Sequence, residues 1–226
     1  MKRGINFSSL EKNTKQKQLD SFFRVSSTTT AATTDSSDTS TSKYKIFCDL
    51  DGVLVDFDTG VRQILNGKGP DDVNSSQLWS SIAKADAFYA NLPWMTDAKL
   101  LWDELKSLTI PVDILTGVPM SKKSRGEKFS WCKRELGVDV NHVDMAGTRS
   151  AHEIVSGRKT KGVVNVITCW SKNKHHESGE NHVLIDDRLK LKHEWEQKGG
   201  TFIHHTDAES TLTVLRNMGI LTCDKE

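Results

Sequence analysis

The stretch IFCDLDGV, residues 46–53, places two aspartates and a glycine directly after a short apolar run. The run has the β-rich composition of a buried strand, so Asp49 and Asp51 are expected where that strand ends. Two carboxylates held close together repel each other, whereas a bound Mg²⁺ would satisfy both with the oxygen ligands that it prefers. The stretch therefore predicts a first strand over Tyr44 to Cys48 and a Mg²⁺ site beside its carboxyl end.

Outward from this stretch, short β-rich runs alternate with helical stretches. Four more strands are predicted, at Pro111 to Leu115, Val163 to Thr168, Val183 to Ile185 and Thr201 to His204. Helices are predicted at Asp97 to Leu108 after Thr96 as N-cap, at Lys122 to Leu136 before Gly137, from about Leu189 to the pair Gly199 and Gly200, and from a capping box of Thr206 and Glu209 to Gly219. This alternation predicts an α/β fold, a Rossmann-like parallel sheet flanked by helices.

The segment from about residue 60 to residue 94 interrupts the alternation with Gly, Pro, Asn and several aromatic residues. It lies between the first and second predicted strands. In open parallel sheets ligands bind beyond the carboxyl ends of the strands, so an insertion there would roof the pocket. We therefore predict a small cap over residues 60–94.

The amino-terminal part of the chain has a different composition. Between Ser26 and Ser42, 13 of 17 residues are Ser or Thr, and no apolar residue is larger than alanine. Such a stretch cannot bury enough surface to offset the entropy lost on ordering. We therefore expect a disordered tail at residues 1–42 and a folded domain at residues 43–226.

Composition excludes several classes of protein. The 31 basic and 30 acidic residues leave a formal charge of +1, so the molecule as a whole is not expected to bind a nucleic-acid backbone strongly. No apolar run approaches the roughly 18 residues needed to cross a bilayer, and no secretory signal is evident at the amino terminus. The four cysteines are widely separated, which is typical of reduced packing thiols. We expect a non-secreted protein without a membrane span.

A second acidic pair follows another predicted strand. The run Val183-Leu184-Ile185 leads into Asp186 and Asp187, and the two acidic pairs would converge if both strands were central and parallel. Each pair also has a structural interpretation, because an Asp-Gly after a strand is usually a turn and an Asp-Asp before a helix is usually an N-cap. It is the ordered set of motifs that favours a chemical role.

With these residues in place, the chain resembles the haloacid dehalogenase superfamily of phosphohydrolases, whose signature begins with DxDG[TV] after the first strand. The resemblance covers nearly all of residues 43–226. The run Ile114-Leu115-Thr116-Gly117 matches the second element of the family, Lys174 matches the third, and Asp186 with Asp187 matches the fourth. All four elements occur in the family's order.

The resemblance implies roles for the carboxylates. Asp49 would be the nucleophile that forms an aspartyl-phosphate, and Asp51 would be the general acid and base. Mg²⁺ would be held by Asp49, Asp186 and the main-chain carbonyl of Asp51. Asp187 would bind the metal through water or orient its neighbours.

The resemblance also implies how the phosphoryl group is bound. Thr116 and the amide of Gly117 would donate hydrogen bonds to its oxygens, and Lys174 would supply a fixed positive charge. Lys172 lies two residues earlier, so it is a second phosphate or substrate contact and an alternative for the catalytic lysine.

Within the superfamily, the chain most resembles the 5'(3')-deoxyribonucleotidase branch. In that branch the aromatic residue after the signature lies against the nucleobase, so Phe57 would be this platform and Trp94 its opposite wall. Equally, both could belong to a small core of the cap together with Trp79, Phe88 and Tyr89. Gly117 departs from the branch, which has a hydroxyl residue after the threonine.

The tail contains a separate motif. Gln16, Leu19, Phe22 and Phe23 fill the pattern QxxΨxxFF, which resembles the peptide that binds the sliding clamp PCNA. In that family the peptide forms a single 3₁₀ turn that projects its apolar side chains into a pocket on the clamp. The resemblance implies PCNA as a partner and a nuclear location. A chance match or an organelle transit peptide is the alternative, which leaves the cytoplasm or an organelle open.

Three functions follow from these motifs. The first is a Mg²⁺-dependent nucleotide phosphatase recruited to PCNA. The second is a phosphatase that removes 3'-phosphates from DNA ends, and the third is a PCNA-binding protein without catalysis.

Overall fold

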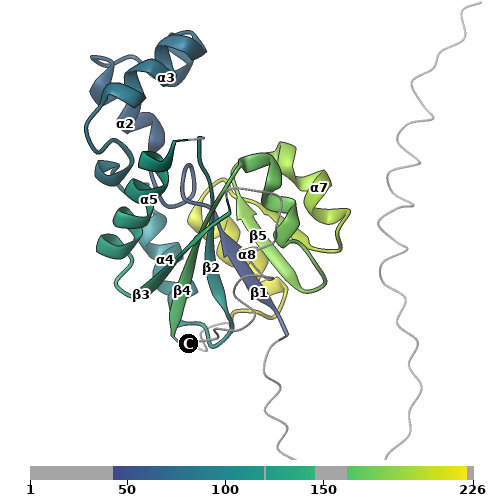
Figure 1. Ribbon diagram of the computed structural model, residues 1–226. Coiled ribbons are helices and arrows are strands. Elements are labelled where there is room, and N and C mark those ends of the chain that lie inside the picture. The colour runs from purple at the N-terminus through teal and green to yellow at the C-terminus, as the bar shows by residue number, and fades with distance from the viewer. Residues whose placement is uncertain (1–42, 120, 146–161, 223–226) are drawn as a thin grey trace, which may run out of the picture. The chain divides into compact units, whose positions relative to one another are not determined.

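The computed structural model describes residues 43–119, 121–145 and 162–222, which form an α/β fold (Figure 1). Six parallel strands make one sheet in the order β3-β4-β2-β1-β5-β6. The strands are β1 (Lys45–Cys48), β2 (Val112–Gly117), β3 (Asp139–Asp144), β4 (Val163–Cys169), β5 (His182–Asp186) and β6 (Thr201–His204). The predicted parallel α/β sheet, with its five predicted strands, is therefore confirmed.

Successive side chains of the central strands point to opposite faces of the sheet, and both faces are buried. Ile46 and Cys48 of β1 belong to one hydrophobic cluster, whereas Phe47 between them belongs to a second cluster on the opposite face. The same alternation separates Ile114 from Leu115 in β2. A strand covered on both faces reads as an uninterrupted apolar run, which is why the sequence identified these strands.

Helices cover the two faces unequally. The first cluster contains buried residues of α4 (Ala98–Ser107), α5 (Lys122–Glu135) and α8 (Ala208–Asn217). The second face is covered by the 3₁₀ turn η5 (Leu189–Leu191) and the short helix α7 (Lys192–Glu196), through Leu191 and Trp195. The helix predicted from Leu189 is therefore a 3₁₀ turn followed by a single short helix, and it ends before Gly199, whose φ is +89°.

Two predicted helix caps are wrong by one residue. Asp207, not Thr206, is the N-cap of α8, because its carboxylate accepts a hydrogen bond from the backbone N–H of Ser210 at 2.8 Å. Asp97, not Thr96, precedes α4, and its carboxylate accepts from the backbone N–H of Ala208 at 2.6 Å. In both cases an aspartate adjacent to the predicted threonine satisfies a free backbone donor.

Strand β3 was not predicted. It lies at the edge of the sheet, pairs only with β4 among the described strands, and buries just Val143 among its six residues. Its sequence DVNHVD has no apolar run, because an edge strand with solvent on its free side needs little apolar surface.

Between β1 and β2 the chain makes an excursion that begins right after Asp49 and Asp51. It contains α2 (Phe57–Ile64), η2 (Pro70–Asp72), α3 (Ser75–Lys84) and η3 (Tyr89–Asn91), and α3 projects away from the sheet in Figure 1. The two ends of the excursion are joined, since Asp56 N–H donates to the carbonyl of Pro93 at 2.9 Å and Met95 N–H donates to that of Leu54 at 2.9 Å. The predicted cap at residues 60–94 falls within this excursion.

The helices in residues 43–119, 121–145 and 162–222 include none that is long and apolar enough to span a membrane. The tail of residues 1–42, with the predicted clamp-binding residues Gln16, Leu19, Phe22 and Phe23, lies outside the described part of the chain.

Candidate functional site

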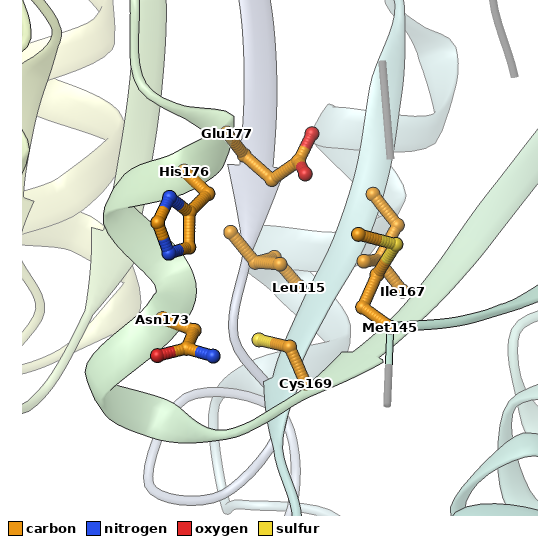
Figure 2. Close-up of a pocket in the computed structure, with 7 residues that line it drawn as sticks. All are labelled: Leu115, Met145, Ile167, Cys169, Asn173, His176 and Glu177. Atoms are coloured by element: carbon orange, nitrogen blue, oxygen red, sulfur yellow. The ribbon is translucent and has the colours of Figure 1, made fainter. Parts of the chain in front are cut away.

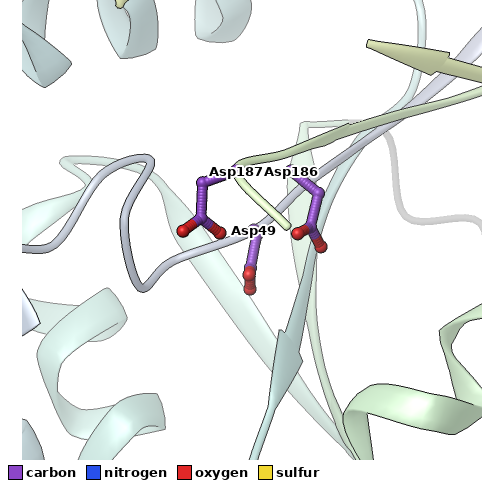
Figure 3. A group of neighbouring side chains, drawn as sticks. All are labelled: Asp49, Asp186 and Asp187. Atoms are coloured by element: carbon purple, nitrogen blue, oxygen red, sulfur yellow. The ribbon is translucent and has the colours of Figure 1, made fainter. Parts of the chain in front are cut away.

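Two neighbouring central strands, β1 and β5, end in the predicted acidic residues. Cys48 lies opposite Ile185, and the backbone N–H of Asp49 donates to the carbonyl of Ile185 at 3.0 Å. This register brings carboxylate oxygens of Asp49, Asp186 and Asp187 within 4.8 Å of one another. Figure 3 shows the three carboxylates side by side and pointing the same way. The structure thus brings together residues that are far apart in the sequence.

A buried lysine joins two of these carboxylates. The ammonium of Lys174 lies 2.8 Å from Asp49 Oδ2 and 2.6 Å from Asp186 Oδ2. The remaining oxygens accept backbone donors, because Leu50 N–H binds Asp49 Oδ1 at 2.8 Å and Arg188 N–H binds Asp186 Oδ1 at 2.9 Å. Each of these two carboxylates is therefore fixed through both of its oxygens.

Electrostatics at the site favour a bound cation. Burial alone would lower the pKa of Lys174, yet Asp49 and Asp186 raise it above its usual range. Burial raises the pKa of Asp186, and the neighbouring charge of Asp49 adds to the effect. Burial, Asp49 and Asp186 together raise the pKa of Asp187 to about 6. The carboxylates are thus short of positive charge even with Lys174 among them.

Gly52 explains why a glycine follows the second aspartate. Its φ is +78°, a conformation that favours glycine, and a Cβ at this position would lie 2.5 Å from Asp187 Oδ2. Glycine therefore allows the loop after β1 to pass against the Asp187 carboxylate. An Asp-Gly pair in this place is part of the acidic site as well as a turn.

A second buried lysine, Lys128, was missed by the sequence analysis. Its ammonium lies 2.5 Å from Asp51 Oδ2, 2.9 Å from Thr116 Oγ1 and 2.8 Å from the carbonyl of Gly117. Lys128 therefore connects the loop after β1 to the end of β2. Thr116 joins the carboxylates at the same end of the sheet.

A signal for Lys128 was present in the sequence. Positions 124, 128, 131 and 132 of α5 follow helical spacing and are all buried, and Lys128 shares this stripe with Trp131 and Cys132. A lysine on the buried stripe of a helix needs an acidic or polar partner inside the protein.

Gly117 follows Thr116 at the position where the 5'(3')-deoxyribonucleotidase branch has a hydroxyl residue. A Cβ at Gly117 would lie 2.1 Å from Ser171 Oγ, so the Ser171 hydroxyl occupies that space. This hydroxyl accepts a hydrogen bond from the guanidinium of Arg188 at 2.9 Å. Any residue larger than glycine at position 117 would therefore clash with the Ser171 hydroxyl.

The two candidate lysines differ in their surroundings. Lys174 contacts Asp49 and Asp186, whereas Lys172 places its ammonium 5.1 Å from the ring centre of Trp170. Of the two, Lys174 is the one positioned beside the proposed nucleophile.

The two aromatic residues predicted to bind a base pack against other aromatic residues. The ring centre of Phe57 lies 5.7 Å from that of Phe88 and 6.4 Å from that of Trp79. Trp94 packs 4.8 Å from Trp131 and donates its indole N–H to Glu135 at 2.8 Å. The contacts of Phe57 are those of the alternative small core of the cap, whereas Trp94 contacts residues of α5. Base binding by Phe57 and Trp94 stays a prediction.

A small hollow lies beside β2, β4 and η4 (Ser171–Glu177), and its apolar residues belong to the second hydrophobic cluster (Figure 2). It is lined by Leu115, Met145, Ile167, Cys169, Asn173, His176 and Glu177. None of these seven is a predicted site residue, so we assign no ligand to this hollow.

No protein-family model matches this chain, and no curated protein matches it either. The functional proposal therefore rests on the sequence motifs and on the chemistry of the site.

Proposed function

We propose that this chain is a Mg²⁺-dependent phosphomonoesterase of the haloacid dehalogenase type, with Asp49 as its nucleophile. One observation carries the proposal. Lysines join the motif residues in two groups at the carboxyl end of a parallel sheet, Lys174 with Asp49 and Asp186, and Lys128 with Asp51 and Thr116. Ligands of open parallel sheets bind at this end.

The residues have the properties that phosphoryl transfer requires. A carboxylate oxygen of Asp49 would attack phosphorus, and the bond to the ester oxygen would break while Asp51 gives that oxygen a proton. A water molecule would then attack the aspartyl-phosphate, lose its proton to Asp51 and release Asp49. Lys174 would stabilise the negative charge on the transferring group.

The residues present fit a divalent cation. Three of the four carboxylates, Asp49, Asp51 and Asp186, form ion pairs with two lysines, and the four carboxylates and two lysines together carry a formal charge of −2 when all are ionised. Asp187 Oδ1 is buried and has no hydrogen-bond partner among the described residues. Asp49, Asp186 and Asp187 would hold Mg²⁺, which would neutralise charge on the phosphoryl group.

The substrate that we propose is a deoxyribonucleotide, with Phe57, Trp94 and Lys172 as base and phosphate contacts. The support is the resemblance of residues 49–57 to the deoxyribonucleotidase branch and the excursion that begins beside the acidic site. A 3'-phosphate on a DNA end is the alternative. Residues 43–226 hold 25 basic and 26 acidic residues, which gives little attraction for a DNA backbone.

A substrate screen tests the proposal. The full chain with Mg²⁺ is incubated with dUMP, dTMP, a 3'-phosphorylated oligonucleotide and p-nitrophenyl phosphate, and released phosphate is measured. We expect turnover of a nucleotide, its loss on chelation with EDTA, and its loss in Asp49→Asn. Turnover of the oligonucleotide alone would favour the DNA-end activity, and no phosphate from any substrate would reject the enzyme.

We further propose that the tail recruits the enzyme to PCNA, and through PCNA to the nucleus. The motif formed by Gln16, Leu19, Phe22 and Phe23 supports this, since paired aromatics in a polar segment suit partner binding. Replacement of Phe22 and Phe23 by Ala should abolish capture of purified PCNA and leave phosphatase turnover unchanged. Equal capture by this variant and by the unaltered chain would reject the proposal.

A further inference from the structure

The ammonium of Lys128 uses all of its hydrogen-bonding capacity inside the site. It has three N–H donors, and three acceptors lie within 2.5 to 2.9 Å, namely Asp51 Oδ2, Thr116 Oγ1 and the carbonyl of Gly117. The side chain is buried, and the ammonium lies 5.2 Å from the ring centre of Tyr89. The position of Lys128 is therefore determined from several sides.

This geometry sets the direction of the Thr116 hydroxyl. An ammonium group can only donate, so Thr116 Oγ1 accepts from Lys128. The hydroxyl hydrogen must then point away from Lys128 and is free to donate to another oxygen. Without Lys128 the hydroxyl could rotate, and its donor would not be aimed.

The same geometry makes the two oxygens of Asp51 different. Oδ2 is held by Lys128 at 2.5 Å. Oδ1 is buried and has no hydrogen-bond partner among residues 43–119, 121–145 and 162–222. Oδ1 is thus the oxygen with capacity left for a proton or for a substrate atom.

We propose that Lys128 is a positioning residue of the phosphatase, which dedicates Asp51 Oδ1 to proton transfer and directs the Thr116 hydroxyl toward the phosphoryl group. The inference rests on the proposed function. When the bond between phosphorus and the ester oxygen breaks, its electron pair stays on the ester oxygen, which takes the proton from Asp51 Oδ1. When water attacks the aspartyl-phosphate, a proton of that water returns to the same oxygen.

The leaving group provides a test that a structural role would not satisfy. The alkoxide released from dTMP needs a proton, whereas p-nitrophenolate is a stable anion that leaves without one. General acid catalysis contributes about 10²–10⁴-fold to a rate. In Lys128→Met we therefore expect kcat to fall by about 100-fold on dTMP and by less than about tenfold on p-nitrophenyl phosphate, with KM for both within about twofold.

Matched variants make the result specific. Lys133→Met removes an exposed lysine from the same helix and should leave kcat on both substrates unchanged. In an Asp51→Asn background, Lys128→Met should lower kcat on dTMP by less than about tenfold, because the proton donor is already absent and only the direction of the Thr116 hydroxyl is lost. Lys128→Arg, which retains the charge and donors, should lose less on dTMP than Lys128→Met, and this comparison serves if the Met variant does not fold.

The outcomes separate the inference from the proposed function. If the unaltered chain hydrolyses neither substrate, the phosphatase and this role of Lys128 are both rejected. If the unaltered chain is active and Lys128→Met loses activity by the same factor on both substrates, or Lys128→Arg does so where the Met variant does not fold, Lys128 only supports the fold.

Discussion

The two ends of the sheet differ in how their carboxylates are compensated. Near the amino ends of the strands, Asp113 of β2 lies 2.8 Å from the ammonium of Lys45 and accepts from the backbone N–H and side-chain amide of Asn165 at 2.9 and 3.0 Å. Both of its oxygens have partners. At the carboxyl ends, three of four carboxylates form ion pairs with two lysines, and one oxygen each of Asp51 and Asp187 has no hydrogen-bond partner among the described residues.

The difference separates a structural from a functional use of buried charge. A carboxylate with one cation and two N–H donors is compensated within the protein, so nothing further is needed there. A group of carboxylates with too few cations carries a cost that a bound cation would relieve, in agreement with the proposed metal site. Four experiments, taken from the largest expected effect to the smallest, test this comparison.

The proposed nucleophile, Asp49, gives the largest contrast. Asp49→Asn should lower turnover by a factor of about 10³ or more, because the amide cannot form the aspartyl-phosphate. Its free energy of unfolding without metal should not fall, since the change relieves repulsion with Asp186. Steady-state kinetics and urea unfolding check the two expectations. Substantial turnover by this variant would mean that another residue attacks phosphorus.

Replacement of Asp113 should lower the stability of the fold and leave turnover nearly unchanged. Asp113→Ala leaves the Lys45 ammonium and the Asn165 donors without their acceptor, and we expect the free energy of unfolding to fall by about 2–3 kcal/mol. Turnover per folded molecule should stay within about twofold, since Asp113 lies at the other end of the strand. Urea unfolding is the measurement, and a stability equal to that of the unaltered chain would remove the structural half of the comparison.

The contact between Gly117 and Ser171 tests how closely the carboxyl end is packed. Gly117→Ala should lower the free energy of unfolding by about 2 kcal/mol, because its Cβ would meet the Ser171 hydroxyl. In a Ser171→Ala background the same change should cost less than about 1 kcal/mol, since the nearest remaining side-chain atom lies 3.2 Å away. Additive losses in the double variant would show that the two residues do not share this space.

The pH dependence of Asp187 should give the smallest effect. Its pKa in the folded chain is about 6, above the ordinary value of a carboxyl group, so the folded state binds the proton more tightly than the unfolded state. The stability that this proton contributes is present at low pH and is lost as the pH rises through about 6.

Differential scanning calorimetry in EDTA checks this expectation. Between pH 5 and pH 7.5, the Tm of the unaltered chain should fall by about 2 °C relative to that of Asp187→Asn. Added Mg²⁺ should oppose the fall, because the metal binds the ionised carboxylates and stabilises the folded state. Parallel profiles of the two proteins would show that Asp187 titrates normally.

The sheet could be predicted because its signals are local. β1, β2, β4 and β5 are buried on both faces, so each is an apolar run that can be read without its neighbours. Strand β3 could not be predicted in this way. Its place at the edge is fixed by pairing with β4, and its own sequence carries little apolar surface.

The same distinction holds at the site. Asp49, Asp186 and Asp187 end or directly follow strands, and Asp51 lies two residues after Asp49, so their convergence depends mainly on strand order. Lys128 belongs to a helix, and its partners come from two other segments, so only the tertiary packing of α5 reveals what it binds. A buried lysine at helical spacing could have raised the question but could not have named Asp51.

The neighbouring positions of β1 and β5 affect how the site arises during synthesis. Asp49 and Asp186 are 137 residues apart along the chain, although their strands are paired. A chain leaving the ribosome therefore carries its first acidic motif long before the second one emerges, and domains fold as units as they emerge. Truncated chains that end before β5 would retain Lys174 but lack Asp186 and Asp187, so an incomplete product would not carry the proposed phosphatase site.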